Sequence, residues 1–378
     1  DSSLDPANLA AVPDSYDIII YNSSGVITEI VQYNTVTATC TSLSFTFTTT
    51  STDSGKIFNE TKPLNISWDI SGGLVSSGTG NTISFAGNTG SALATVTANY
   101  SPGTSIYFGG VVFDSKVSSM DTSNLGNLLG KLYLSFNDLT SLDVSGNTAL
   151  TSLIAQSNDI TSLDVSSNTA LTVLSCGINP LTSLNVNGAS ALLTLSVSSN
   201  LLGSLDITNN TNLTTLVCTG SSLTSLNVTQ NTALELLNCS SNSLTSLDIT
   251  NNTNLITLTC TGCSLTSLDI SQNTALETVE CTNNQLTSLD VSNNTALANL
   301  TCTNNQLTSL DISNNTALSL LTCFNNQLAT AAIDTIFSDL AAGSISNGQL
   351  IIDVGRSIPG SDANKATLVS RGWTIVEN

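Results

Sequence analysis

The stretch "LTCTNNQLTSLDISNNTAL", residues 300–318, carries the pattern that decides the fold of this chain. In it a leucine is followed two positions later by a second apolar residue and three positions after that by an asparagine, and this order occurs twice. Near-copies recur every 21 residues without an insertion, starting at Leu139, Ile160, Leu181, Leu202, Leu223, Leu244, Leu265, Leu286 and Leu307. A constant spacing of this length predicts one structural unit stacked on itself many times.

Each repeat has two halves of the form Leu-x-x-Leu-x-apolar-x-x-Asn. The alternation at Leu300 and Cys302 predicts a short strand whose apolar side points inward, and Asn305 predicts the turn after it. This pattern resembles the leucine-rich repeat family, and the wording "LTSLDVSNNTAL" is similar to bacterial leucine-rich repeats common in Bacteroidetes surface proteins. The resemblance covers residues 117–327. It implies a solenoid of 21-residue repeats, whereas function has to be argued from particular sites.

We expect three parts along the chain. Residues 1–116 contain short alternating runs such as "LSFTFTT" separated by Gly, Ser, Asn and Pro, which predicts an all-β, sandwich-like domain that serves as an anchor. Residues 117–138 resemble a degenerate entry repeat, and nine repeats occupy residues 139–327. Residues 328–378 form the predicted capping unit.

The predicted cap begins with "LATAAIDTIFSDLAAG", which places four apolar residues on one helical face and ends at Gly343. The four are Ile333, Ile336, Phe337 and Leu340. A strand in "GQLIIDVG", a short helix in "DANKATLVSRG" and a final strand in "WTIVEN" follow. This α/β order resembles the closing segment of leucine-rich repeat proteins from marine bacteria and their tailed phages.

The charge balance excludes several classes of partner. The chain has 27 acidic and 7 basic residues, no histidine and a formal net charge of -20, and no Lys or Arg occurs between Lys131 and Arg356. Nucleic acid and anionic membranes require basic groups, so we expect neither as a partner. No run of 18 apolar residues predicts membrane insertion.

The same composition indicates where the protein works. Low charge with abundant Thr, Ser and Asn is typical of extracellular, cell-surface or virion proteins. Because the sequence opens at Asp1 without a signal segment, we expect a processed or trimmed soluble product.

Seven cysteines occupy one position of the repeat: Cys176, Cys218, Cys239, Cys260, Cys281, Cys302 and Cys323. Ala155 and Val197 fill that position elsewhere, so it requires a small apolar side chain, and we expect a buried structural ladder of free thiols. Parallel side chains on neighbouring strands have poor geometry for disulfides. Cys263 stands where other repeats carry the turn asparagine, which leaves open a local disulfide with Cys260 or a plain substitution. Four metal ligands are not available here, because the chain has no histidine.

Two polar ladders accompany the cysteines. The asparagines that end each half-repeat are expected to satisfy backbone groups at the turns. An aspartate column, interrupted by Asn185 and Asn227, consists of Asp143, Asp164, Asp206, Asp248, Asp269, Asp290 and Asp311. Because asparagine replaces aspartate twice, we expect acceptors for turn N–H groups. The alternative is a calcium site, the only cofactor considered, with candidate ligands Asp248, Asp269, Asp290 and Asp311.

The outward side chains around the strand form the candidate binding face. The selected residues are Thr259, Thr261, Glu280, Thr282, Thr301, Thr303, Thr322 and Phe324. Glu235 and Glu277 are further individual members. The face is weakly polar with few aromatic anchors, so it suits glycans or a repetitive surface better than a hot-spot interface. A plain solvated face is the alternative.

These observations favour a non-enzymatic adhesion or recognition protein on a bacterial surface or virion, with a protein or glycan ligand. The alternative is a structural subunit that assembles with copies of itself into a filament, sheath or phage capsid decoration. Thr-Cys-Thr at 259–261 and 301–303 is similar to motifs of some insect antifreeze proteins, but only two of nine repeats carry it. An enzyme is not expected, because catalytic motifs are missing and only acid pairs such as Glu277 and Glu280 remain.

Overall fold

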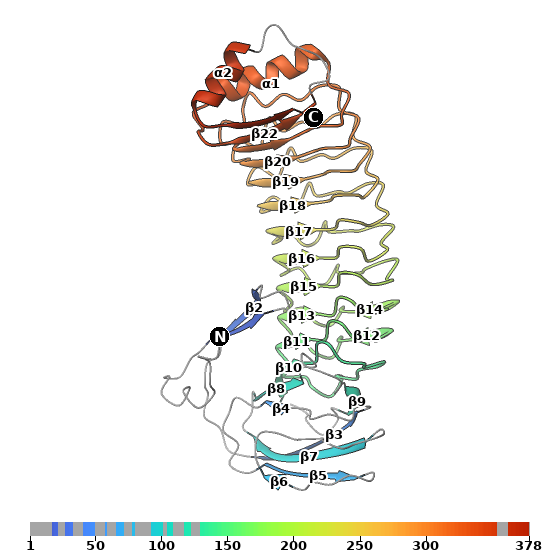
Figure 1. Ribbon diagram of the computed structural model, residues 1–378. Coiled ribbons are helices and arrows are strands. Elements are labelled where there is room, and N and C mark those ends of the chain that lie inside the picture. Colours follow the sequence, from blue (N-terminus) through green and yellow to red (C-terminus); the bar gives the residue numbers. More distant parts are fainter. Residues whose placement is uncertain are drawn as a thin grey trace.

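The computed structural model describes residues 129–353 and 362–377 and, before them, the course of nine strands between residues 17 and 121. Figure 1 shows the repeats as a parallel β-solenoid, in which each turn lays one strand beside the strand of the previous turn. Leu300 pairs with Val279 on one side and with Leu321 on the other, so one 21-residue repeat makes one turn. The predicted solenoid is confirmed.

The main sheet has 14 strands, and its order follows the sequence through the repeats. The strands of the repeats are β10 (Leu129–Tyr133), β11 (Ser152–Ile154), β13 (Val173–Ser175), β15 (Thr194–Ser196), β16 (Thr215–Val217), β17 (Leu236–Asn238), β18 (Thr257–Thr259), β19 (Thr278–Glu280), β20 (Asn299–Thr301) and β21 (Leu320–Thr322). On the opposite side of the coil, β12 (Ser162–Asp164) pairs with β14 (Ser183–Asn185). The column is gently curved, and the main sheet lines its concave side (Figure 1).

The hydrophobic core is one continuous stack inside the coil. The central residue of each three-residue strand of the main sheet points inward, as Leu258 does in β18, and is fully buried. The cysteine position follows two residues later and is also buried, as at Cys260. Because a turn buries these side chains only against its neighbours, the repeats depend on one another for stability.

A buried asparagine ladder follows the "LDI" half of every repeat but one, in which Ala189 takes the position. Asn294 Nδ2 donates to the carbonyls of Ile270 at 3.0 Å and Asn273 at 2.9 Å, and Asn315 repeats this one turn later. The Oδ1 atoms of Asn273 and Asn294 have no hydrogen-bond partner within the described residues. The position therefore uses the two amide donors, which explains why asparagine and never aspartate stands there: a carboxylate would face two carbonyl oxygens.

The second asparagine ladder lies at the turn after the main strand and uses both ends of the amide. Asn305 donates to the carbonyls of Cys281 and Cys302, each at 3.0 Å, while its Oδ1 accepts the N–H of Leu286 at 3.0 Å. The residue just before it, Asn304, has a left-handed backbone with φ 53°. Asparagine adopts this conformation more readily than most residues do, so the turn is built from two asparagines with different tasks.

The N-terminal strands continue the main sheet across the predicted boundary at residue 116. The strands are β1 (Asp17–Tyr21), β2 (Ile27–Gln32), β3 (Thr41–Thr49), β4 (Ile57–Phe58), β5 (Ile66–Ser71), β6 (Gly78–Thr79), β7 (Ala92–Tyr100), β8 (Thr104–Phe108) and β9 (Val117–Asp121). Strand β8 pairs with β10, and β4 pairs with β8. The first turn of a solenoid has an unpaired edge, which strands from the preceding segment satisfy.

Five of these strands form an antiparallel sheet in the order β6-β5-β7-β3-β9. It includes β9, which the sequence placed at the start of the entry repeat, so residues 117–121 pair with β3 in this sheet. Much of residues 1–116 lies outside the described residues, and the sandwich-like arrangement stays a prediction.

The last elements are α1 (Thr330–Ala342), β22 (Gln349–Ile352), α2 (Asp362–Ser370) and β23 (Thr374–Glu377). The two strands extend the main sheet beyond β21, and Figure 1 shows both helices at that end of the column. The apolar face predicted for the first helix is buried. Trp373 donates its ring N–H to the carbonyl of Ile345 at 2.9 Å. That this segment caps the solenoid stays a prediction.

The buried ladder yields a matched pair of mutations on adjacent asparagines. Asn294→Ala removes two donors from buried carbonyls and should lower the free energy of unfolding by about 2 kcal/mol. Asn293 is exposed and donates to the Ser271 carbonyl at 3.2 Å, so Asn293→Ala should cost less than about 0.5 kcal/mol. Urea denaturation followed by circular dichroism measures both, and equal losses would show that the buried ladder does not stabilise the solenoid.

Candidate functional site

The concave strand face presents side chains in parallel rows. Thr259, Glu280, Thr301 and Thr322 lie in register on successive strands, so the structure brings these four predicted residues into one row. Their backbones are fixed by the sheet at a spacing of about 4.8 Å. The surface is thus a rigid, regular array.

The other four predicted residues form a second row, just beyond the strand ends, which is less accessible than expected. Thr303 is only 3% exposed, whereas Thr261, Thr282 and Phe324 are half-buried. The hydroxyls of Thr282 and Thr303 are buried without a hydrogen-bond partner in the described part of the chain. The chain turns inward here because the next residue takes the left-handed conformation, as at Asn304. The prediction that Thr303 faces solvent was therefore wrong.

A third row, one residue before each strand, contains the most distinctive surface. Glu235, Ile256 and Glu277 lie on successive turns, because the N–H of each of the last two donates to the carbonyl of the one before, at 2.8 and 2.9 Å. Ile256 is 40% exposed and both glutamates are exposed, as is Glu280 at the end of β19. We call Glu235, Ile256, Glu277 and Glu280 the glutamate patch.

Sequence reasoning singled out the glutamates of this patch but missed Ile256 and, further along the same row, Leu193, which is 43% exposed. The signal was present. Both residues directly follow a buried leucine, at a position that is Ala, Ser, Thr or Glu in other repeats. A large apolar residue at a position of small or polar residues identifies an outward side chain with no core to fill.

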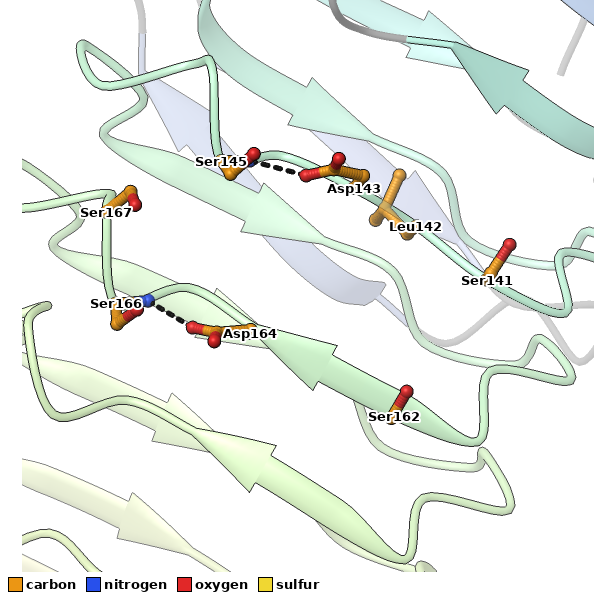
Figure 2. A pocket seen from close by; sticks show the side chains of 8 residues that line it. All are labelled: Ser141, Leu142, Asp143, Ser145, Ser162, Asp164, Ser166 and Ser167. Carbon is orange, nitrogen blue, oxygen red and sulfur yellow. Dashed lines mark hydrogen bonds between the residues drawn. The ribbon is translucent and has the colours of Figure 1, made fainter.

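The aspartate column lies on the other side of the coil, beside β12 and β14. Figure 2 shows Asp143 and Asp164 on successive turns, among serine side chains. Together these residues line a groove of about 380 Å³. Asp143 accepts the N–H of Ser145 at 2.9 Å, and Asp164 accepts that of Ser166 at 2.8 Å. Each carboxylate therefore closes its own turn.

These hydrogen bonds set the acidity of the column. The Ser166 hydroxyl and N–H lower the pKa of Asp164, and the Thr250 and Ser271 groups do the same for Asp248 and Asp269. Asn227 accepts the N–H of Thr229 at 3.1 Å in the same way, so an uncharged acceptor also serves. This explains the two asparagines in the column.

The geometry offers no assembled metal site. Within the described residues, no group of three or more Asp, Glu, Cys or His side chains could hold a metal ion. Calcium binding by Asp248, Asp269, Asp290 and Asp311 stays a prediction. None of the described helices is long and apolar enough to cross a membrane.

The cysteine ladder lies inside the coil, away from these surfaces. All seven of its sulfurs and that of Cys263 are buried and free, so Cys260 and Cys263 are not bridged. Burial raises the pKa of the Cys176, Cys218 and Cys323 thiols to about 12. A protonated, buried thiol is a poor nucleophile, and these three side chains act as small apolar groups.

Comparisons with known proteins identify the fold. No protein-family model and no curated protein matches the chain. The functional domain of InlJ from Listeria monocytogenes, described as including a cysteine ladder, is 29% identical with a TM-score of 0.47; the match covers 65% of this chain and 64% of that domain.

Two further solved structures superpose better. The leucine-rich repeat protein LIC12759 of Leptospira interrogans is 24% identical with a TM-score of 0.55, over 65% of this chain and 72% of that one. The internalin InlF of Listeria monocytogenes is 21% identical with a TM-score of 0.54, over 72% and 85%. The solenoid therefore has the leucine-rich repeat fold.

The aspartate column predicts a specific acid sensitivity. Hydrogen bonds hold the folded-state pKa values below the ordinary 3.8, so their stabilisation is present above that pH and is lost as the pH falls through the folded-state values. The triple variant Asp248→Asn, Asp269→Asn, Asp290→Asn should lose less stability than the wild type between about pH 5 and pH 2. Urea midpoints across this range measure the difference.

Glu235→Gln, Glu277→Gln, Glu280→Gln removes the same number of charges elsewhere, so an equal effect would assign the acid sensitivity to net charge. The same samples test calcium. We expect melting temperatures to agree in calcium and in chelator, and a calcium-induced rise in the wild type but not in the aspartate variant would establish a site in the column.

Proposed function

We propose that this chain is a non-enzymatic recognition protein that binds a protein partner on its concave strand face. The glutamate patch is the observation that carries this proposal. It places three exposed carboxylates around an exposed isoleucine on a surface that the sheet holds rigid. The leucine-rich repeat fold supports a binding role, although the fold alone does not specify one.

The charges of the chain define the partner's chemistry. No Lys or Arg occurs between Lys131 and Arg356, so the glutamates have no basic neighbour on the solenoid to neutralise them. A partner that presents Lys or Arg around an apolar side chain complements Glu235, Ile256 and Glu277. Since the strands fix the backbone before binding, little conformational entropy is lost on association.

The wider setting is proposed from composition and layout. The protein works outside the cell, on a bacterial surface or virion, with residues 1–116 as the anchor, 117–327 as the recognition solenoid and 328–378 as the cap. The threonine row of Thr259, Thr301 and Thr322 is a hydroxyl-rich surface beside the patch and suits a glycan on the partner. Catalysis has no place in this proposal.

Binding assays with matched variants test the proposal. Purified chain is applied to arrays of surface proteins and of glycans, and hits are measured by surface plasmon resonance at several salt concentrations. Glu235→Gln, Glu277→Gln, Glu280→Gln should weaken binding by about tenfold, equivalent to about 1.4 kcal/mol, and should reduce its salt dependence. The triple aspartate variant is the control, and its affinity should equal that of the wild type.

Two outcomes would overturn the proposal. Equal binding by both triple variants would place the interface elsewhere. Ordered assemblies of the purified wild-type chain, seen by light scattering and electron microscopy, would instead favour the structural-subunit alternative, in which copies of the chain are the partner.

A further inference from the structure

One turn of the solenoid departs from the asparagine ladder at the strand end. In the regular turn, Asn284 donates to the carbonyl of Cys260 in the previous turn at 2.9 Å and to that of Cys281 in its own at 3.0 Å. Cys263 occupies this position one turn earlier. The position lies inside the coil, and Cys263 is fully buried.

The Cys263 sulfur points to the previous turn, toward Cys239. Its Sγ lies 3.2 Å from the Cys239 carbonyl oxygen, the acceptor that an asparagine amide would contact from the same position. The two thiols are also close enough for each to shift the pKa of the other. The residue that Cys263 contacts in the previous turn is thus a ladder cysteine 24 residues away.

The chain contains an internal comparison for this arrangement. Ser221 also replaces the turn asparagine, and its hydroxyl donates to the carbonyl of Val197 at 2.7 Å, as Cys263 does to that of Cys239. There the ladder position is valine. The fold therefore tolerates a small side chain at the turn without a second cysteine, and an apposed pair of thiols is not needed to build the turn.

We propose that Cys239 and Cys263 form an oxidation site, at which a small hydroperoxide such as hydrogen peroxide joins successive turns of the solenoid through a disulfide bond. Burial limits access to small oxidants. The pair closes a loop between β17 and β18, so the cross-link covalently fastens two turns that the reduced chain holds only by packing and hydrogen bonds.

The two thiols have different chemical roles in this reaction. The interaction between the two side chains lowers the pKa of Cys263 and raises that of Cys239, so Cys263 forms a thiolate more readily than Cys239 does. Peroxide transfers one oxygen atom to the Cys263 sulfur, giving a sulfenic acid and water. The Cys239 sulfur then attacks it, the S–S bond forms, and the oxygen leaves as a second water. Peroxide is reduced, and both thiols are oxidised.

Peptide mapping of the full chain tests the cross-link. Trypsin cannot cut between Lys131 and Arg356, but cleavage before aspartates separates residues 206–247, with Cys218 and Cys239, from residues 248–268, with Cys260 and Cys263. Peroxide treatment of the folded protein, alkylation and non-reducing mass spectrometry should detect the two fragments joined. The denatured product should have lost two titratable thiols, and dithiothreitol should restore both.

Three variants assign the bridge to its residues. Cys263→Ser copies Ser221, Cys239→Val copies Val197, and both should abolish the joined fragments, whereas Cys302→Ala should keep them. Oxidation should also raise the melting temperature of the wild type by several degrees but not that of Cys263→Ser. Full retention of thiols in the wild type, a bridge confined to residues 248–268, or joined fragments in Cys263→Ser would overturn the proposal.

Discussion

The structure depends on the satisfaction of backbone groups by buried asparagine side chains at the two sides of each turn. The main strands are three residues long, so most of a 21-residue turn lies outside the sheet and its carbonyls need other partners. Asn294 and Asn305 supply them across successive turns. Since an unpaired buried carbonyl is costly, these amides decide that turns stack in one register.

The same constraint separates the positions that must repeat from those that are free to vary. Leucine, cysteine and asparagine positions face the interior, where a neighbour exists above and below, and a change there alters two interfaces. Outward positions contact only solvent and adjacent side chains. The variation therefore gathers on the strand face, where Glu235, Ile256 and Glu277 stand among threonines.

Individual departures from the repeat are informative because the background is so regular. At Asn227 the change preserves the hydrogen bond and removes only a charge, which identifies the column as a set of turn acceptors. At Cys263 the change places a second thiol beside a ladder cysteine and creates a chemical pair that no other described turn contains. A single substitution in the repeat thus has different consequences on the two sides of the coil wall. Outside, at Asn227, it changes only a charge; inside, at Cys263, it changes a contact between turns.

The sequence by itself determined the solenoid and its inward positions. These follow from periodicity, which requires only local regularity. Only the tertiary structure decided that Thr303 is buried, that β8 extends the sheet across residue 116, and that Cys263 meets Cys239. The physical reason is that such contacts join adjacent turns, and the direction of a side chain at a turn depends on backbone angles that the repeat pattern does not encode. For Ile256 both were needed. Its position in the repeat indicates an outward side chain, whereas its place between Glu235 and Glu277 follows from the hydrogen bonds that join successive turns.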